Sequence, residues 1–137
     1  MTPVFVDTGA FYALVDRSDA NHRASTTALK ALAAQERPLV TTTYVVDETL
    51  TLVRFRVGHA AAVTLGRRLL ATHWCRVADV SDEIRNAAWY MFCRFADQSF
   101  SFTDCTSFAF MQTSGISDAF TFDRRDFAAA GLVALPA

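Results

Sequence analysis

Short apolar runs alternate with longer segments of helical period along almost the whole chain, and this alternation constrains the fold more than any other feature. The apolar and β-branched runs, which predict strands, cover residues 4–6, 39–43, 74–80, 99–103 and 118–122, with a short sixth at 132–135. Helical periodicity predicts helices over residues 11–15, 21–35, 44–57, 60–71, 81–95 and 104–114. The pattern therefore indicates an α/β domain with a mostly parallel, five-stranded central sheet and helices on both faces.

The size and composition of the chain fit one domain spanning residues 1–137. Its 52% hydrophobic and 20% charged residues are enough for a sizeable core, and twelve phenylalanines predict a tightly filled interior or an apolar interface. No apolar stretch approaches the roughly 18 residues that span a membrane, and Asp7 interrupts the first apolar run, which argues against a signal peptide. Three cysteines without CxxC spacing argue against a disulfide framework or zinc site and suit a reducing cytoplasm.

Four acidic residues stand where an apolar run gives way to a helix or loop. They are Asp7, Glu48, Asp104 and Asp123. Because the carboxyl ends of parallel strands meet at one edge of a sheet, we expect these side chains to lie close together. Gathered carboxylates repel one another unless a cation is present, and hard oxygen ligands suit Mg²⁺ or Mn²⁺. The set predicts a metal-dependent hydrolase that acts on phosphodiesters.

Each of the four acids also has an ordinary structural interpretation. Asp7 could simply be the N-cap of the first helix. Asp104 could be a cap as well, with Thr103 as a rival for that role. Asp123 could belong to a plain charged turn over residues 123–126. The set carries more weight than any member because its members fall on different elements at one predicted edge.

Glu48 is the acid that is hardest to explain structurally. Its neighbours at i−4, i+4 and i+7 on the predicted helix are Tyr44, Leu52 and Phe55, so its own face is apolar. A carboxylate buried there needs a partner, which would be a metal or an arginine. The adjacent Asp47 points about 100° away around the helix and is expected to be solvated.

Hydroxyl and arginine side chains near the acids supply further candidate site residues. Thr8, Thr103 and Thr121 each lie within two residues of a site acid, so they could hold a carboxylate or a metal-bound water. For Thr121, ordinary strand filling is an equal alternative. Arg54 and Arg56 are candidates to position phosphate, although a net charge of −1 gives no general support for nucleic-acid binding.

Other phosphate and hydrolase chemistries lack their signatures. The chain has no GxxxxGK[ST] loop and no GxGxxG fingerprint. Gly9 stands where a haloacid-dehalogenase-like phosphatase would need a second aspartate, and Lys30 is wrongly placed for a receiver domain. Three scattered histidines do not suggest zinc, and no serine has the pattern of a catalytic triad.

The chain resembles the PIN-domain nucleases, and within them the VapC-type toxins of bacterial toxin–antitoxin modules. The segments that carry the resemblance cover residues 5–11, 47–54, 101–108 and 121–124 and read FVDTGAF, DETLTLVR, SFTDCTSF and TFDR. The resemblance implies an α/β/α sandwich and a Mg²⁺- or Mn²⁺-dependent endoribonuclease whose metal is held by Asp7, Glu48, Asp104 and Asp123. Of these, Asp7 and Asp104 would be the most direct ligands.

The same resemblance implies partners. Such toxins cut structured RNA, often transfer or ribosomal RNA, and so stop translation. They commonly form homodimers and are silenced by a small antitoxin that blocks the acidic pocket. Three other functions stay open from sequence: a non-catalytic RNA-binding PIN domain, an RNA-processing nuclease outside a toxin–antitoxin module, and a DNA-acting flap-type nuclease, for which 137 residues leave little room.

Overall fold

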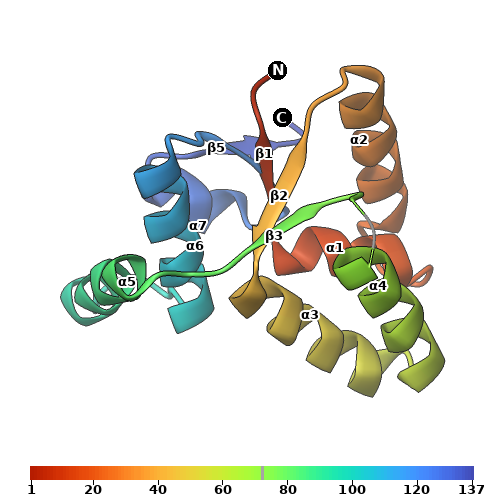
Figure 1. Cartoon of the computed structure of the whole chain (residues 1–137), viewed down its shortest axis with the longest axis horizontal. Helices are drawn as coiled ribbons and strands as arrows, with labels where there is room; N and C mark the ends of the chain where they lie inside the picture. Colours follow the sequence, from red (N-terminus) through yellow and green to blue (C-terminus); the bar gives the residue numbers. More distant parts are fainter. Residues whose placement is uncertain (72) are drawn as a thin grey trace.

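Residues 1–71 and 73–137, the part of the chain that the computed structural model describes, form five strands and seven helices (Figure 1). The strands are β1 (Val4–Val6), β2 (Leu39–Thr42), β3 (Arg76–Ala78), β4 (Asp118–Phe120) and β5 (Val133–Leu135). The helices are α1 (Thr8–Val15), α2 (His22–Ala34), α3 (Thr43–Arg56), α4 (His59–Ala71), α5 (Asp82–Arg94), α6 (Phe102–Ser114) and α7 (Arg124–Ala129). The α/β class and the parallel five-stranded sheet predicted from sequence are confirmed.

The sheet is parallel throughout, and its strand order of β3-β2-β1-β4-β5 places a topological switch beside β1. The chain moves outward from β1 to β2 and β3, then returns to the other side of β1 to form β4. Phe5 on β1 is in register with Val40 on β2 and with Ala119 on β4. The carboxyl ends of β1 and β4 therefore flank the switch point, where open α/β sheets bind ligands.

Helices cover both faces of the sheet, as right-handed crossovers require. Figure 1 shows α1, α2 and α4 on one side of the sheet and α5, α6 and α7 on the other, with α3 extending beyond the carboxyl end of β2. None of the helices among the described residues combines the length and apolar character that crossing a membrane requires.

Phenylalanine rings fill much of the core, as the composition predicts. Phe108 is fully buried and lies edge to face against Phe127 and Phe100, with ring centroids 5.0 Å apart in both pairs. Phe5 and Phe120 are fully buried on the two strands that flank the switch point. The strand ends that carry the candidate site thus rest on a rigid aromatic interior.

The predicted strand over residues 99–103 is wrong. Ser101 is instead the N-cap of α6: its hydroxyl accepts a hydrogen bond from the Asp104 amide, and the Asp104 carboxylate accepts one from the Ser101 amide. Phe100 and Phe102 do alternate with serines, but their rings pack on other aromatic rings rather than on a sheet. A capping box therefore outweighs a local pattern of period two.

The other differences concern shorter features. Helix α7, whose N-cap is Asp123, was not predicted, and β3 is shorter than the predicted run over residues 74–80. The sixth predicted run becomes β5, at the edge of the sheet. Two predicted helix ends are confirmed: the Ser81 hydroxyl caps α5, and Gly115 ends α6 in the left-handed conformation at φ 69°.

Candidate metal centre

Asp7 lies at the carboxyl end of β1, in the N-cap position of α1, yet its side chain does not cap that helix. Its backbone carbonyl accepts the first helical hydrogen bonds, from the amides of Ala10 and Phe11. Asp7 is only 8% exposed. Its carboxylate instead accepts a hydrogen bond from the Thr121 hydroxyl. The capping interpretation thus accounts for the backbone of Asp7 but not for its buried carboxylate.

Thr121 connects two of the predicted acids. Its fully buried hydroxyl donates to Asp7 Oδ2 at 2.9 Å and accepts from the amide of Asp123 at 3.0 Å. Because β1 and β4 are neighbours, one side chain just beyond β4 can hold the acid at the end of β1 and fix the loop that carries the next acid. Thr121 is therefore more than strand filling.

Asp104 lies in the first turn of α6, held there by the capping box with Ser101. Its Oδ2 accepts from the Ser101 amide at 2.9 Å. A carboxylate can accept further ligands through its second oxygen, so the capping role and a metal-binding role are compatible. The box also fixes the orientation of the side chain toward the other acids.

Asp123 brings a fifth acid to the site. It caps α7 by accepting from the Asp126 amide at 3.3 Å, and one carboxylate oxygen from each of Asp104, Asp123 and Asp126 lies within 4.8 Å of the others. Asp126 is 6% exposed, and sequence reasoning missed it as a site residue. Asp126 lies one helical turn after Asp123, but α7 has only six residues, which is too short for a periodic signal in the sequence.

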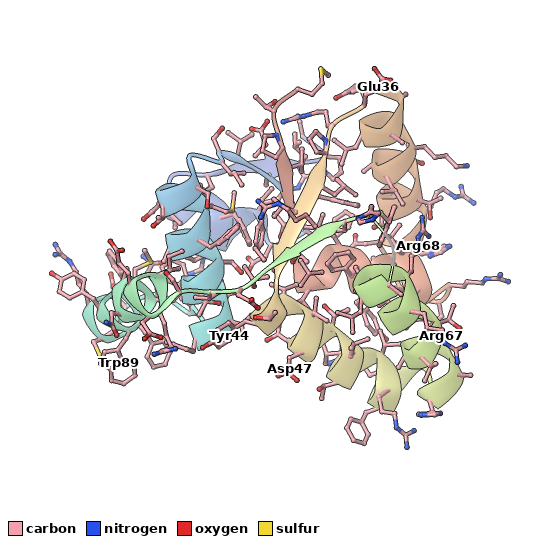
Figure 2. All side chains as sticks on the ribbon, in the orientation of Figure 1. Glu36, Tyr44, Asp47, Arg67, Arg68 and Trp89 are labelled. Carbon is pink, nitrogen blue, oxygen red and sulfur yellow. The ribbon has the colours of Figure 1, made fainter. Side chains whose placement is uncertain are left out.

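Glu48 completes one cleft with three of these acids. The cleft is lined by Asp7, Thr8, Gly9, Tyr12, Asp19, Asn21, Glu48, Leu52, Arg56, Asp104, Phe122 and Asp123. Glu48 is half-buried on α3, and no arginine lies within 4 Å of its carboxylate among the described residues. The neighbouring Asp47 is exposed, as expected (Figure 2). All four predicted acids therefore lie at one cleft.

The two candidate arginines lie on different sides of α3. Arg56 lines the acidic cleft, with its guanidinium 5.5 Å from the centroid of the Tyr12 ring. Arg54 lines a separate groove between α3 and α4. Two residues of separation on a helix correspond to about 200°, so only one of the pair can face the acids.

The two remaining threonines have different surroundings. The Thr8 hydroxyl is buried next to Asp7 and has no hydrogen-bond partner among the described residues. Thr103 is half-buried, and its backbone carbonyl accepts from the Thr106 hydroxyl. An unpaired buried hydroxyl is uncommon in native proteins, and here it lies where a ligand of the cleft could satisfy it.

The acids are crowded and short of positive charge. Burial raises the pKa of Asp7 to about 7, and the charges of Asp104 and Asp123 add to this, whereas the Thr121 hydrogen bond opposes it. Burial also raises the pKa of Asp123 to about 6, with help from the charges of Asp126 and Asp104.

The pKa of Asp104 moves in the same direction. Burial raises it, and the charges of Glu48 and Asp126 contribute, while the hydrogen bonds with Ser101 lower it. A hard divalent cation would offset the repulsion between these carboxylates, because it offers positive charge that no described side chain supplies within 4 Å. The all-oxygen donor set and the orphan Thr8 hydroxyl fit Mg²⁺ or Mn²⁺.

Comparison with known proteins identifies the family of the chain. The sequence profile of the PIN domain matches residues 4–132. The chain belongs to the PIN-domain family. Over 131 residues, 95% of each chain, this PIN domain is 40% identical to proteins named 23S rRNA-specific endonuclease VapC20 from two strains of Mycobacterium tuberculosis.

Solved structures also show similarity to VapC20. The crystal structure of Mycobacterium tuberculosis VapC20, described as a sarcin-ricin loop cleaving toxin, matches with a TM-score of 0.84 and 38% identity, covering 95% of this chain and 96% of that one. FitAcB from Neisseria gonorrhoeae matches with a TM-score of 0.70 at 15% identity, covering 96% and 95%, and so shows the shared fold alone. The resemblance to VapC-type PIN domains is confirmed.

Proposed function

We propose that this PIN domain is a Mg²⁺- or Mn²⁺-dependent endoribonuclease and the toxin of a toxin–antitoxin module. The observation that carries the proposal is the group of buried and half-buried carboxylates at the switch point of the sheet, none of which has an arginine or lysine nitrogen within 4 Å among the described residues. The 40% identity to VapC20 supports the same activity. Metal-assisted hydrolysis of a phosphodiester is the chemistry that such a donor set serves best.

The side chains of the cleft divide this work. Asp7, Glu48, Asp104 and Asp123, together with Asp126, would hold the cation, which when bound supplies an activated water and neutralises charge on the phosphate. Thr121 keeps Asp7 oriented through its hydrogen bond, and the Thr8 hydroxyl is placed to support the same end of the cleft. Arg56 is the cation on the rim and would bind a phosphate oxygen of the strand.

The reaction we propose is an in-line displacement at phosphorus. The oxygen of a water molecule forms a bond to phosphorus while the bond from phosphorus to the 3′ oxygen breaks. The water proton passes to a carboxylate or to solvent, and the 3′ oxygen takes up a proton from solvent and leaves as a hydroxyl. The products are a 5′-phosphate and a 3′-hydroxyl end.

Ribosomal RNA is the substrate that we favour over transfer RNA. The relatives with 40% identity are named for cleavage of 23S rRNA, and the VapC20 structure is described as that of a toxin that cleaves the sarcin-ricin loop. Cleavage of ribosomal RNA in the cytoplasm would inhibit translation. A cognate antitoxin would then silence this PIN domain by covering the acidic cleft with a basic side chain, and we expect the free toxin to be a homodimer.

Cleavage of purified ribosomes and of total cellular RNA tests the function. We expect wild type to produce discrete fragments with Mg²⁺ or Mn²⁺ and none with EDTA, and sequencing of the fragment ends should place the cut in 23S rRNA. A folded, antitoxin-free protein that cuts nothing with either metal would leave a non-catalytic RNA-binding role instead.

A further inference from the structure

Positive charge is concentrated in one part of the sequence. Residues 49–78 contain five arginines and no aspartate or glutamate, whereas the rest of the chain contains eight basic and fourteen acidic residues. Although the net charge of the whole chain is −1, residues 49–78 form an acid-free, positively charged segment. Such a segment attracts polyanions even when the whole protein is acidic.

The fold gathers part of this charge around one groove between α3 and α4. The groove is lined by Leu50, Thr51, Arg54, Phe55, Ala62, Val63, Gly66 and Arg67. Arg54 on α3 and Arg67 on α4 are both exposed, so each wall carries one cation. At Gly66, an added Cβ would lie 3.5 Å from the Leu50 side chain, which shows how closely the two helices approach beneath the groove. In Figure 2, Arg67 lies on the opposite side of the molecule from Trp89 of α5.

Phe55 is an aromatic ring displayed at this groove. It is 81% exposed, and the Arg54 guanidinium lies 5.9 Å from its centroid. Val53, two residues earlier on α3, is fully buried and anchors this end of the helix. The ring therefore cannot turn into the core, and it pairs an exposed π-face with a nearby cation, as proteins that bind single-stranded nucleic acid do.

The groove and the acidic cleft are both lined by residues of α3. Successive helical residues differ by about 100°, so Arg54, Phe55 and Arg56 wrap around the end of α3 from one side to the other. Arg54 faces the groove and Arg56 faces the cleft. A strand whose phosphate lies at the cleft can thus pass over the end of α3 into the groove.

We propose that the groove between α3 and α4 docks the RNA strand next to the scissile phosphate, with Phe55 stacking on a base and with Arg54 and Arg67 contacting phosphates. This inference rests on the proposed ribonuclease function and adds the strand's path to it. An unpaired base is the natural ligand of an exposed ring between cations, and RNA recognition usually uses such splayed bases. The absence of any acid on the segment favours this polyanion.

Binding in EDTA tests the proposal separately from cleavage. The probe is a fluorescein-labelled single-stranded RNA of about 12 nucleotides, within the range that such surfaces cover. We compare wild type, Phe55→Ala, Phe55→Trp and the double variant Arg54→Glu/Arg67→Glu. The matched control is Lys30→Glu/Arg85→Glu, which makes the same charge change at exposed positions on α2 and α5. Melting curves confirm that each variant is folded.

We expect Phe55→Ala to weaken RNA binding by about 10-fold, Phe55→Trp to retain it, and the charge-reversed double variant to weaken it further. The slope of log affinity against log salt should also fall by about 1.4 in that double variant, since two phosphate contacts are lost. RNA affinities equal to that of the control in every variant would overturn the proposal and leave an acidic protein segment as the occupant of the groove. Because no metal is present, failure of wild type to cleave RNA would not affect this result.

Discussion

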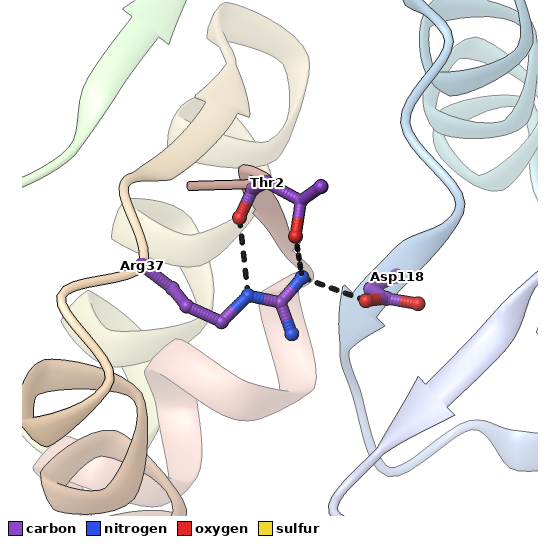
Figure 3. A network of polar contacts seen from close by, with 3 residues as sticks. All are labelled: Thr2, Arg37 and Asp118. Carbon is purple, nitrogen blue, oxygen red and sulfur yellow. Dashed lines mark hydrogen bonds and ion pairs between the residues drawn. The ribbon is translucent and has the colours of Figure 1, made fainter.

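Aspartates at the two ends of the sheet have opposite electrostatic surroundings. Strand β4 begins at Asp118, whose Oδ2 lies 2.7 Å from Arg37 Nη2, and Arg37 also donates to the backbone carbonyl and hydroxyl of Thr2 (Figure 3). Beyond the other end of the same strand, Asp123 lies among Asp104, Asp126 and the carboxylate of Asp7, with no cation within 4 Å among the described residues. At the first end, the negative charge of Asp118 is balanced by Arg37, and we call this the balanced end. At the other end, no nearby side-chain cation among the described residues balances the acids, and we call this the unbalanced end.

This difference separates a stabilising ion pair from the proposed metal site. Asp118 has a partner that ties the segment before β2 and the start of the chain to β4, so its charge supports the folded state. Burial, and then the charges of neighbouring acids, raises the pKa values of Asp7 and Asp123, so their ionised forms weaken the fold until a cation binds. Proteins commonly accept such a cost at sites whose chemistry needs it.

The sharpest contrast should appear in RNA cleavage. We expect Asp104→Asn to lower the cleavage rate by at least about 10³-fold, because several kcal/mol of transition-state stabilisation depend on the cation. Asp118→Asn, the same substitution at the balanced end, should leave the rate near that of wild type. Initial rates on ribosomal RNA with Mn²⁺ measure both, and equal losses would show that the two ends of the sheet do not differ in their role in cleavage.

The next effect concerns the pH dependence of stability without metal. The folded pKa of Asp7, about 7, lies above its ordinary value of 3.8, so folding favours the protonated form. Its contribution is fully present below pH 3.8 and is lost as the pH rises through about 7, a change of roughly 4 kcal/mol at most.

Asp7→Asn should therefore be more stable than wild type in EDTA at pH 8, and this advantage should vanish near pH 4. Thermal unfolding of the two proteins across that range measures the difference directly. A stability advantage that does not change with pH would show that ionisation of Asp7 does not destabilise the folded protein.

A smaller effect should follow loss of the hydroxyl that joins β1 to β4 at the cleft. Thr121→Val keeps the shape of the side chain but removes its bonds to Asp7 and to the Asp123 amide. We expect Mn²⁺ affinity to fall by about 10- to 100-fold, as is typical when a ligand loses its supporting partner.

The matched control is Thr41→Val on β2, which removes a buried hydroxyl that donates to the Val6 carbonyl at 2.8 Å. This variant should lose stability but keep Mn²⁺ affinity. Similar affinities in the two variants would mean that Thr121 only fills space.

The smallest effect belongs to the balanced end. Arg37→Ala leaves a partly buried Asp118 without its partner and should lower the free energy of unfolding by about 1–2 kcal/mol. Asp118→Asn should cost less, and the double variant less than the sum, because the two residues share one interaction. Urea unfolding measures these values, and normal cleavage by all three variants confirms that this end has no role in catalysis.

Sequence alone revealed the unbalanced end better than the balanced one. Asp7, Glu48, Asp104 and Asp123 could be found because acids beside apolar runs converge in a parallel sheet. Asp126 could not, since a helix of six residues such as α7 is too short for a periodic signal. The pairing of Arg37 with Asp118 joins residues 81 positions apart, and no local pattern encodes such a distance.

The incorrect or missing sequence predictions also arise because local patterns do not encode tertiary contacts. The alternating serines and phenylalanines before Asp104 resemble a strand, whereas the capping box of α6 and the packing of the rings decide the structure. Arg54 and Arg56 looked equivalent because only the packing of α3 against its neighbours shows which one faces the cleft. Strand order was likewise unreadable, since it depends on contacts between distant segments.

Calorimetric titration with Mn²⁺ at pH 7.5, using wild type, Asp7→Asn and Asp118→Asn, tests whether the acids of the cleft form a metal site. We expect wild type and Asp118→Asn to bind the ion alike and Asp7→Asn to bind it far more weakly. Binding by wild type should be weaker at pH 5.5, where the ion must displace a proton from Asp7. Equal binding by all three proteins would contradict the claim that the unbalanced acids at the switch point form the metal site.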